Sequence, residues 1–394
     1  MKEAKINTDN WSFKLGILSV SLLAQTAPLL SVATPQLEKA FPNMSQEAIE
    51  ELSSLPNLSV VFLILFSTAI AKKIGIKKTV MTGLFLFLIG GVLPAFLNNY
   101  WAIAACRLLM GLGFGLFNPF SVSMLYIFYK DEDLSNMLGY QNCFQNLGNA
   151  AFGVLMGVLV LGGWRVAFMG FAIAIIPLLL FGYKVRIPAD KDETAADSSS
   201  KKEKQATNAH VFAIATLMLI GIALFMVMTI KLPSFVVTAK ITSTSVASSV
   251  LGGMALVSMV SSSIFGKVQH ILKNYIMGIA LLGIFISFII VANSHTLIIM
   301  ILGVAVGGWF FGWVFPQGFF RLGEVAPKNS GNLATSIVLM FVSFGAFLSP
   351  IATNGIAQLF GMGSPAGVFT VSGYIFAIVG IAHLVYTAIE YKRA

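Results

Sequence analysis

The sequence predicts an all-α integral membrane protein with twelve transmembrane helices, arranged as two six-helix bundles related by pseudo-two-fold symmetry. Three observations support this prediction. First, 57% of the 394 residues are hydrophobic and only 10% are charged, whereas soluble domains average about 45–50% apolar and about 25% charged residues. Second, the chain contains apolar runs of the length that crosses a bilayer, about 20 residues per helix. Third, Lys and Arg residues concentrate in alternate loops, which is typical of membrane proteins.

Six predicted spans lie in the first half of the chain. They come from runs without Asp, Glu, Lys or Arg, cut at turn residues. The first four cover residues 15–37, 52–71, 79–97 and 101–128, and the fourth contains one charge, Arg107. The run 134–164 carries the fifth span and residues 166–183 the sixth, with a tight turn at 162–165 between them.

The second half of the chain gives six more spans. Residues 211–230 and 241–266 are the seventh and eighth. The run 274–320 is too long for one helix and breaks at 293–295, and the run 329–389 breaks at 361–365. Glycines and a proline at the second break do not easily continue a helix. Twelve spans are therefore expected.

The distribution of basic residues predicts that both termini are cytoplasmic and that the protein lies in the plasma membrane. With this orientation, 20 of the 25 Lys and Arg residues lie in inner segments. Four lie in outer segments, namely Lys39, Arg165, Lys231 and Lys240, and Arg107 lies within a span. The net charge of +9 is thus mainly an orientation signal and does not indicate a nucleic-acid partner. Residues 1–14 and the segment after them lack a signal-peptide cleavage site.

The composition divides the chain into two halves. Residues 189–209 are rich in Asp, Glu, Lys, Ser and Ala, which is typical of a flexible linker. We expect an N-terminal bundle at 1–188, a cytoplasmic linker at 189–209 and a C-terminal bundle at 210–394. An offset of 197 residues places Pro119 on Pro316 and Gly148 on Gly345, which favours an internal duplication.

Four features of the chain form a pattern over nearly its whole length. They are the basic, Gly-containing loop 71–78, the Arg-x-x-x-Gly-x-Gly pattern at residues 107–115, the entry to the sixth span at residues 163–168, and the central basic linker. Together these features resemble the major facilitator superfamily. In the loop, Lys72 and Thr68 replace the usual aspartate and first glycine of the family's motif.

This resemblance implies a central cavity that opens alternately to each side and is lined chiefly by spans one, four, seven and ten. It also implies conformational roles for the loop and for the glycines of the fourth span. These residues are Lys72, Lys73, Gly75, Lys77, Lys78, Gly111, Gly113 and Gly115. The glycines have two interpretations, close helix packing and a hinge.

Arg107 is the one clear charge within the predicted spans, because all sixteen Asp and Glu residues can be assigned outside them. An intramembrane arginine costs at least about 2.5–3.5 kcal/mol unless it has a partner or faces water. One hypothesis is that Arg107 attracts an organic anion. The other is that it holds helices together through backbone carbonyls or amides. Lys231, at the outer end of the seventh span, has two interpretations, a second contact for an anion and, as the favoured one, a side chain that extends its ammonium to the membrane interface.

Polar and aromatic residues within the spans complete the candidate substrate site. Amides on one side of the fifth span contact either a ligand or another helix, since lipid would be an unfavourable environment. Trp309 and Trp313 suit stacking on an aromatic or amphipathic substrate, or simple packing. With Arg107, the candidates are Gln25, Asn118, Asn142, Gln145, Asn146, Trp309, Trp313 and Gln317.

These observations predict a secondary active transporter that moves a small organic anion or an amphipathic carboxylate by alternating access. The alternative is a proton-driven multidrug efflux antiporter, although the fifth span lacks the Gly-Pro pattern of such proteins. A non-transporting sensor is a third hypothesis, without an appended domain to support it. We expect a monomer that uses protons or a counter-anion, with no enzymatic activity, cofactor or metal. Cys106 and Cys143 are expected as core residues.

Overall fold

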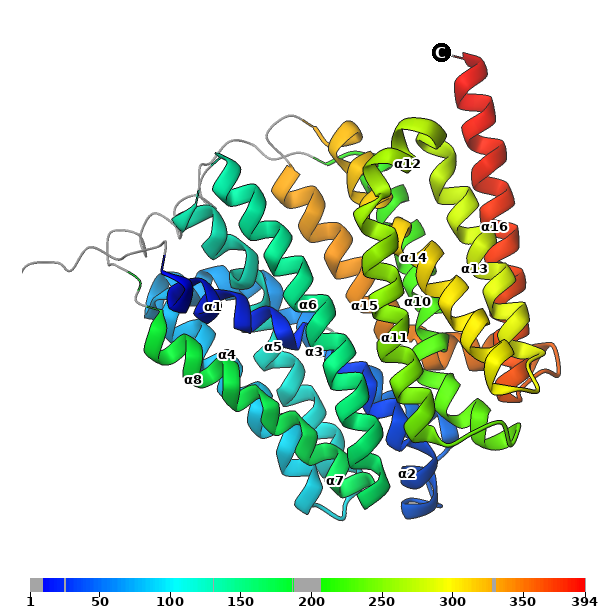
Figure 1. Ribbon diagram of the computed structural model, residues 1–394, viewed down its shortest axis with the longest axis horizontal. Helices are drawn as coiled ribbons and strands as arrows, with labels where there is room; N and C mark the ends of the chain where they lie inside the picture. Colours follow the sequence, from blue (N-terminus) through cyan, green and yellow to red (C-terminus); the bar gives the residue numbers. More distant parts are fainter. Residues whose placement is uncertain are drawn as a thin grey trace, which may run out of the picture. The chain divides into compact units, whose positions relative to one another are not determined.

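The computed structural model describes residues 10–24, 26–129, 131–185, 187, 207–327 and 331–393, and these residues form helices and their connections (Figure 1). The predicted linker lies almost wholly outside the described residues. The helices of the first half are α1 (Trp11–Ser19), η1 (Val20–Leu23), η2 (Ala27–Ala33), α2 (Thr34–Ala40), α3 (Gln46–Ile74), α4 (Ile76–Val92), η3 (Leu93–Phe96), α5 (Tyr100–Phe128), α6 (Asp131–Leu159), η4 (Val160–Gly162), α7 (Trp164–Met169), η5 (Gly170–Ala174) and α8 (Ile175–Lys184).

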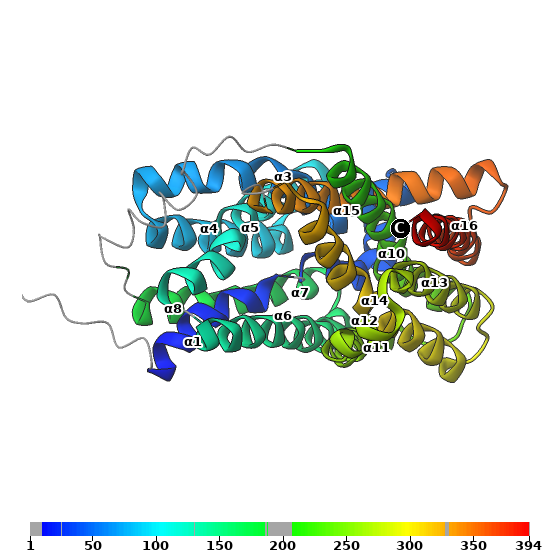
Figure 2. The ribbon, with the colours of Figure 1, turned by 90° about the horizontal axis from the view of Figure 1, so that it is seen from above.

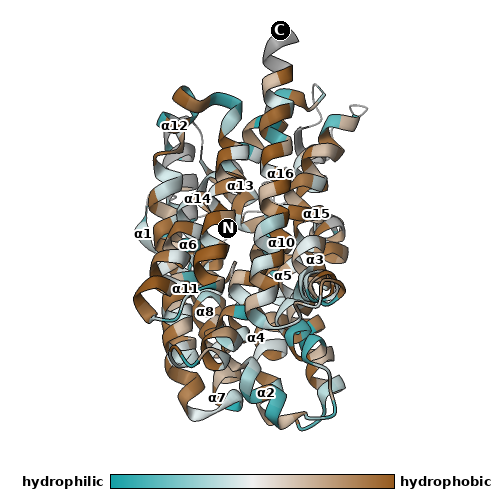
Figure 3. Cartoon of the chain, turned by 90° about the vertical axis from the view of Figure 1, so that its right-hand side faces the viewer, coloured by the Kyte–Doolittle hydropathy of each residue, from teal (hydrophilic) through white to brown (hydrophobic). Residues whose placement is uncertain are grey.

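The helices of the second half are α10 (Ala209–Thr238), α11 (Thr244–Ser263), α12 (Phe265–Leu272), η6 (Lys273–Tyr275), α13 (Ile276–Ala292), α14 (Leu297–Val325), α15 (Gly331–Leu359) and α16 (Pro365–Arg393). Among the described residues, ten helices are long and apolar enough to cross a membrane, and the pair Trp11–Leu23 and Ala27–Ala40 gives an eleventh if it is one span. The 29-residue helix α3 contains the predicted second span. Figure 3 shows hydrophobic residues along these helices and hydrophilic residues near some of their ends, for example around α12.

Three differences from the predicted spans bear on the site. The described part of the first span contains more than one helix, with η1 ending at Leu23 and η2 beginning at Ala27. Helix α3 begins at Gln46 rather than at residue 52, since the Ser45 hydroxyl accepts a hydrogen bond from the Ala48 N–H and caps the helix. Helix α10 continues past residue 230 to Thr238. The predicted spans end at charged residues and therefore miss both extensions, because Glu47, Glu50 and Glu51 lie within α3 and Lys231 lies within α10.

The helices pack into two compact units that do not coincide with the two halves of the sequence. Unit 1 comprises Met1–Ala27, Leu55–Phe152 and Trp164–Lys202. Unit 2 comprises Pro28–Ser54, Gly153–Gly163 and Glu203–Ala394. In unit 1, α4 packs along α5, and α1 packs on α8. In unit 2, α10 packs along α15, and α13 lies between α14 and α16, as Figures 1 and 2 show. Two segments of the first half therefore pack with the second half.

The internal duplication is visible in a repeated contact. In unit 1, a Cβ atom at Gly148 would overlap the carbonyl oxygen of Leu22. In unit 2, a Cβ atom at Gly345 would lie 2.5 Å from the carbonyl oxygen of Leu219. Leu219 follows Leu22 by the same 197 residues that separate the two glycines. Both repeats thus use a glycine to bring two helix backbones into contact, which supports the predicted duplication.

Candidate functional site

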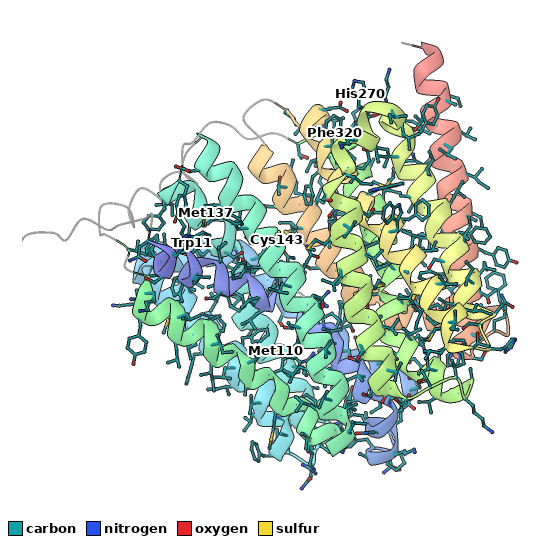
Figure 4. All side chains as sticks on the ribbon, in the orientation of Figure 1. Trp11, Met110, Met137, Cys143, His270 and Phe320 are labelled. Carbon is teal, nitrogen blue, oxygen red and sulfur yellow. The ribbon has the colours of Figure 1, made fainter. Side chains whose placement is uncertain are left out.

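Arg107 is completely buried in unit 1 and bonded to protein groups. Its Nη2 donates to the carbonyl oxygen of Ala27 at 2.8 Å, and its Nη1 donates to the sulfur of Met110, which Figure 4 labels, at 2.9 Å. The guanidinium carbon lies 5.2 Å from the centre of the Phe171 ring, a distance at which a cation is attracted to an aromatic face. Ala27 is the first residue of η2, so this hydrogen bond joins α5 to the start of η2. This geometry supports the helix-holding alternative for Arg107.

The glycines of the fourth span let α5 approach α3 and α4. A Cβ atom at Gly111 would overlap the carbonyl oxygen of Pro56, and one at Gly113 would lie 2.5 Å from that of Gly83. At Gly115 the nearest atom, the Cβ of Leu63, is 3.0 Å away. The packing interpretation therefore has direct support at Gly111 and Gly113, because no larger residue fits there.

The basic loop between α3 and α4 contains one glycine with a special backbone conformation. Gly75 has a φ of 87°, a region that residues with a Cβ rarely adopt. Its N–H donates to Ala71, and Lys77 Nζ donates to the carbonyl oxygen of Gly182 on α8 at 2.8 Å. Lys73 and Lys78 are exposed, whereas the side chain of Lys72 lies outside the described residues. The loop thus joins α3, α4 and α8 within unit 1.

The predicted amides do not form one described cluster. Gln25 lies outside the described residues, as does the side chain of Asn142. Asn118, Gln145 and Asn146 are half-buried on α5 and α6. Gln145 accepts a long hydrogen bond, 3.5 Å, from Gln141 on the same helix. Their role as substrate contacts therefore remains a proposal.

Trp309 and Trp313 pack α14 against α11 in unit 2. The Trp313 Nε1 donates to the carbonyl oxygen of Ser261, and the Ser261 hydroxyl donates to the carbonyl oxygen of Trp309. The two rings meet edge to face, with their centres 6.3 Å apart. Trp313 is buried and Trp309 half-buried. These contacts fit the packing alternative, which the sequence left open.

Gln317, one turn further along α14, differs from the other amides. It is 1% exposed, and among the described residues neither its Nε2 nor its Oε1 has a hydrogen-bond partner. A buried polar group without a partner costs about 1–3 kcal/mol. Such a group in a native protein calls for an explanation, such as a water or a ligand.

A buried ion pair lies in unit 2, where the sequence placed none. Lys231 on α10 is 2% exposed, and its Nζ lies 2.6 Å from Oε1 of Glu50 on α3, which is 0% exposed. The Gln46 side chain also donates to Glu50 Oε1, and the Asn354 Nδ2 on α15 donates to Glu50 Oε2 at 2.9 Å. The expectation that Lys231 reaches the membrane interface is wrong, because α3 starts early enough to bring Glu50 to it.

Two further carboxyl groups adjoin this pair. Glu51 follows Glu50 on α3 and accepts a hydrogen bond from the Ser54 hydroxyl at 2.8 Å. Glu38 on α2 interacts electrostatically with both Glu50 and Lys231. At the first turn of α3, Glu47 accepts a hydrogen bond from Gln358. A backbone hydrogen bond at the start of α3 holds the pKa of Glu47 below its usual value. The sequence analysis assigned these acidic residues to positions outside the spans, so it did not predict that their side chains lie near Lys231.

Unit 2 also joins the two halves of the sequence through small residues. The Ser248 hydroxyl on α11 donates to the carbonyl oxygen of Gly153 at 2.6 Å. A Cβ atom at Gly157 would lie 2.6 Å from the carbonyl oxygen of Ser245. The Ser31 hydroxyl donates to the carbonyl oxygen of Thr229 on α10. We call these contacts, together with the Glu50–Lys231 pair, the seam of unit 2.

Comparison with known proteins decides the family. Residues 15–294 match the family model described as Major Facilitator Superfamily. The chain belongs to the major facilitator superfamily. It is therefore a multi-pass membrane transporter of small molecules. The predicted all-α fold of this superfamily is confirmed, and the described helices are consistent with twelve spans in two bundles.

Solved structures of superfamily members show the same fold over nearly the whole chain. A D-xylose-proton symporter matches with a TM-score of 0.70 and 14% identity, over 95% of this chain and 97% of that chain. A peptide transporter in complex with alafosfalin matches with a TM-score of 0.72 and 15% identity, over 96% and 94%. The nucleoside transporter NupG matches with a TM-score of 0.68 and 15% identity, over 95% and 98%. At this identity the likeness shows the fold alone.

One curated protein is similar in sequence over a short region. It is the methylenomycin A resistance protein of Bacillus subtilis (strain 168), 33% identical over 114 residues. The match covers 28% of this chain and 24% of the relative.

Proposed function

We propose that this chain is a secondary active transporter of the plasma membrane, with both termini cytoplasmic, that exports small amphipathic organic compounds by alternating access. Organic carboxylates are the first substrate class to test. The observation that carries export as the direction is the similarity to a protein named for antibiotic resistance. The seam supports alternating access, because it closes first-half segments against second-half helices through contacts that can separate as a group.

Within this proposal, Gln317 is the residue that we assign most directly to substrate. Its amide has donors and acceptors without a hydrogen-bond partner among the described residues, and Gln317 follows Trp313 by four residues on α14. Asn118, Gln145, Asn146 and Trp309 are half-buried and remain further proposed contacts. Arg107 is bonded to the protein in this structure, so an anion would have to replace the Ala27 carbonyl as its partner.

Transport into inverted membrane vesicles tests the function. Vesicles containing the full chain receive an imposed pH gradient and labelled methylenomycin A, a series of amphipathic carboxylates, or lipophilic cations. We expect uptake of carboxylates above that of vesicles without the protein. Uptake of lipophilic cations alone would favour the multidrug alternative. No uptake of any of them in either direction would overturn the proposal.

Variants separate the proposed contacts from structural residues. Gln317→Leu keeps the size of the side chain and removes the unsatisfied amide, so we expect lower transport with stability unchanged or higher. Asn293→Leu, at an exposed position after α13, is the matched control and should transport normally. Arg107→Ala should lower stability if Arg107 holds helices, and should lower carboxylate transport at unchanged stability if it attracts the substrate.

A further inference from the structure

The end of unit 1 that contains the α3–α4 loop carries basic residues with few acidic residues to balance them. Residues 52–130 and 134–189 contain no Asp or Glu, and the acidic residues between these ranges, 131–133, begin α6. Three exposed lysines at this end are Lys73, Lys78 and Lys184. None of them forms an ion pair with another residue in the described part of the chain. This end therefore attracts anions.

One close contact brings the basic residues of α4 and α8 together. The Lys77 Nζ on α4 donates to the carbonyl oxygen of Gly182 on α8 at 2.8 Å. A Cβ atom at Gly182 would lie 3.1 Å from the Cε of Met81 on α4, so the glycine allows the two helices to approach each other closely. Lys78 follows Lys77, and Lys184 lies two residues after Gly182. The start of α4 and the end of α8 thus form one basic surface.

The same two helices expose apolar side chains next to these lysines. On α8, Leu179 and Tyr183 lie one turn apart on the same face, and Tyr183 is 79% exposed. On α4, Phe85 follows Lys78 by seven residues, so it lies on the same face as this lysine, and it is also exposed. In a membrane-spanning helix, exposed apolar faces contact lipid chains. The basic surface is therefore continuous with surfaces that suit lipid.

We propose that Lys78 and Lys184, beside the Lys77–Gly182 contact, bind the phosphate headgroup of an anionic phospholipid whose chains lie along the exposed faces of α4 and α8. The apolar spans Ile76–Phe96 and Trp164–Lys184 begin and end at these lysines, so the ammonium groups lie at the level of the headgroups. Basic side chains between transmembrane helices recognise anionic headgroups in this way. The site goes beyond the proposed function, which it uses only to assign the lipid to the cytoplasmic leaflet.

The apolar faces favour a phospholipid over a soluble phosphate ester. A soluble anion would contact only the lysines, whereas the chains of a phospholipid also cover Leu179 and Phe85. Tyr183 presents an aromatic ring beside Lys184, and tyrosine is enriched where membrane and water meet. Because one headgroup would contact lysines on both helices, its binding should also stabilise the packing of α4 on α8.

Native mass spectrometry of the full chain in detergent tests this binding. The chain is titrated with phosphatidylglycerol, which is anionic, or with phosphatidylcholine, which has no net charge. In the double variant Lys78→Gln, Lys184→Gln we expect the affinity for the first phosphatidylglycerol to fall by roughly fivefold for each lysine. The control Lys39→Gln, Lys240→Gln removes two exposed lysines elsewhere and should bind as the wild type does. Equal affinity for phosphatidylglycerol in the wild type and the first variant would overturn the proposal.

Thermal unfolding separates a lipid from a soluble anion. Phosphatidylglycerol should raise the Tm of the wild type and of the control, and should raise the Tm of Lys78→Gln, Lys184→Gln less. Glycerol 3-phosphate carries the phosphate without the chains, so we expect it to leave the Tm unchanged. An equal rise with glycerol 3-phosphate would assign the lysines to a soluble anion and overturn the lipid assignment. Neither experiment measures transport, so both results stand whether or not export is found.

Discussion

Replacement of Lys231 by methionine should strongly destabilise the protein. Methionine keeps the length of the apolar part of the side chain but removes the ammonium that lies 2.6 Å from Glu50 Oε1. Glu50 is 0% exposed and would retain only its amide donors from Gln46 and Asn354. Breaking a buried pair from one side costs about 3–5 kcal/mol, because the other charge stays buried without compensation. We therefore expect a loss of about 3 kcal/mol in the free energy of unfolding.

Unfolding of the purified full chain in detergent, by denaturant or heat, measures this loss. The double variant Glu50→Gln, Lys231→Met should recover most of the stability, since neither charge remains. Lys240→Met, at an exposed lysine after the same helix, is the control and should have little effect. A Lys231→Met variant as stable as the wild type, or a double variant no more stable than the single one, would contradict a stabilising role for the buried pair.

Three further predictions concern other contacts. Gly148→Leu should prevent α6 from packing at Leu22 and reduce the amount of folded protein, as measured by size-exclusion chromatography; Gly163→Ala, where no atom lies within 4 Å, tests strain at positive φ without a clash. Arg107→Lys should lower the thermal stability, because one ammonium cannot bond both Ala27 and Met110 as the guanidinium does; equal stability would contradict the helix-holding role. Glu47→Gln should lower stability above about pH 4.5, and the difference should vanish as acid protonates Glu47 below that value, since its folded pKa is lowered; a constant difference in pH titrations would count against this assignment.

The sequence was informative about the fold because the bilayer imposes a strong pattern. Apolar runs, turn residues and the distribution of Lys and Arg predict where most spans lie in the sequence and how they are oriented. The internal duplication was also visible, and the contacts of Gly148 and Gly345 now give it a physical basis. Boundaries failed where a helix continued through charged residues, as α3 does at Glu50 and Glu51 and α10 does at Lys231.

The sequence was less informative about the site. It named Arg107 and Gln317 from composition alone, but it could not tell a bonded side chain from one with free donors. The structure distinguishes them, because Arg107 donates to Ala27 whereas Gln317 has no partner among the described residues. The signal that could have placed Glu50 on a helix was Ser45 followed by Glu47, because an N-cap serine and an acidic residue in the first turn are typical of a helix start.

The sequence by itself determined the class of protein, its spans and its predicted orientation, because these depend on the hydrophobicity of local segments in a bilayer. Only the tertiary structure decided which charges are buried together. Glu50 and Lys231 are 181 residues apart, and no local pattern relates them. Their pairing depends on the packing of the Pro28–Ser54 segment with α10 and α15, and the energy of a charge depends on the groups that surround it after packing.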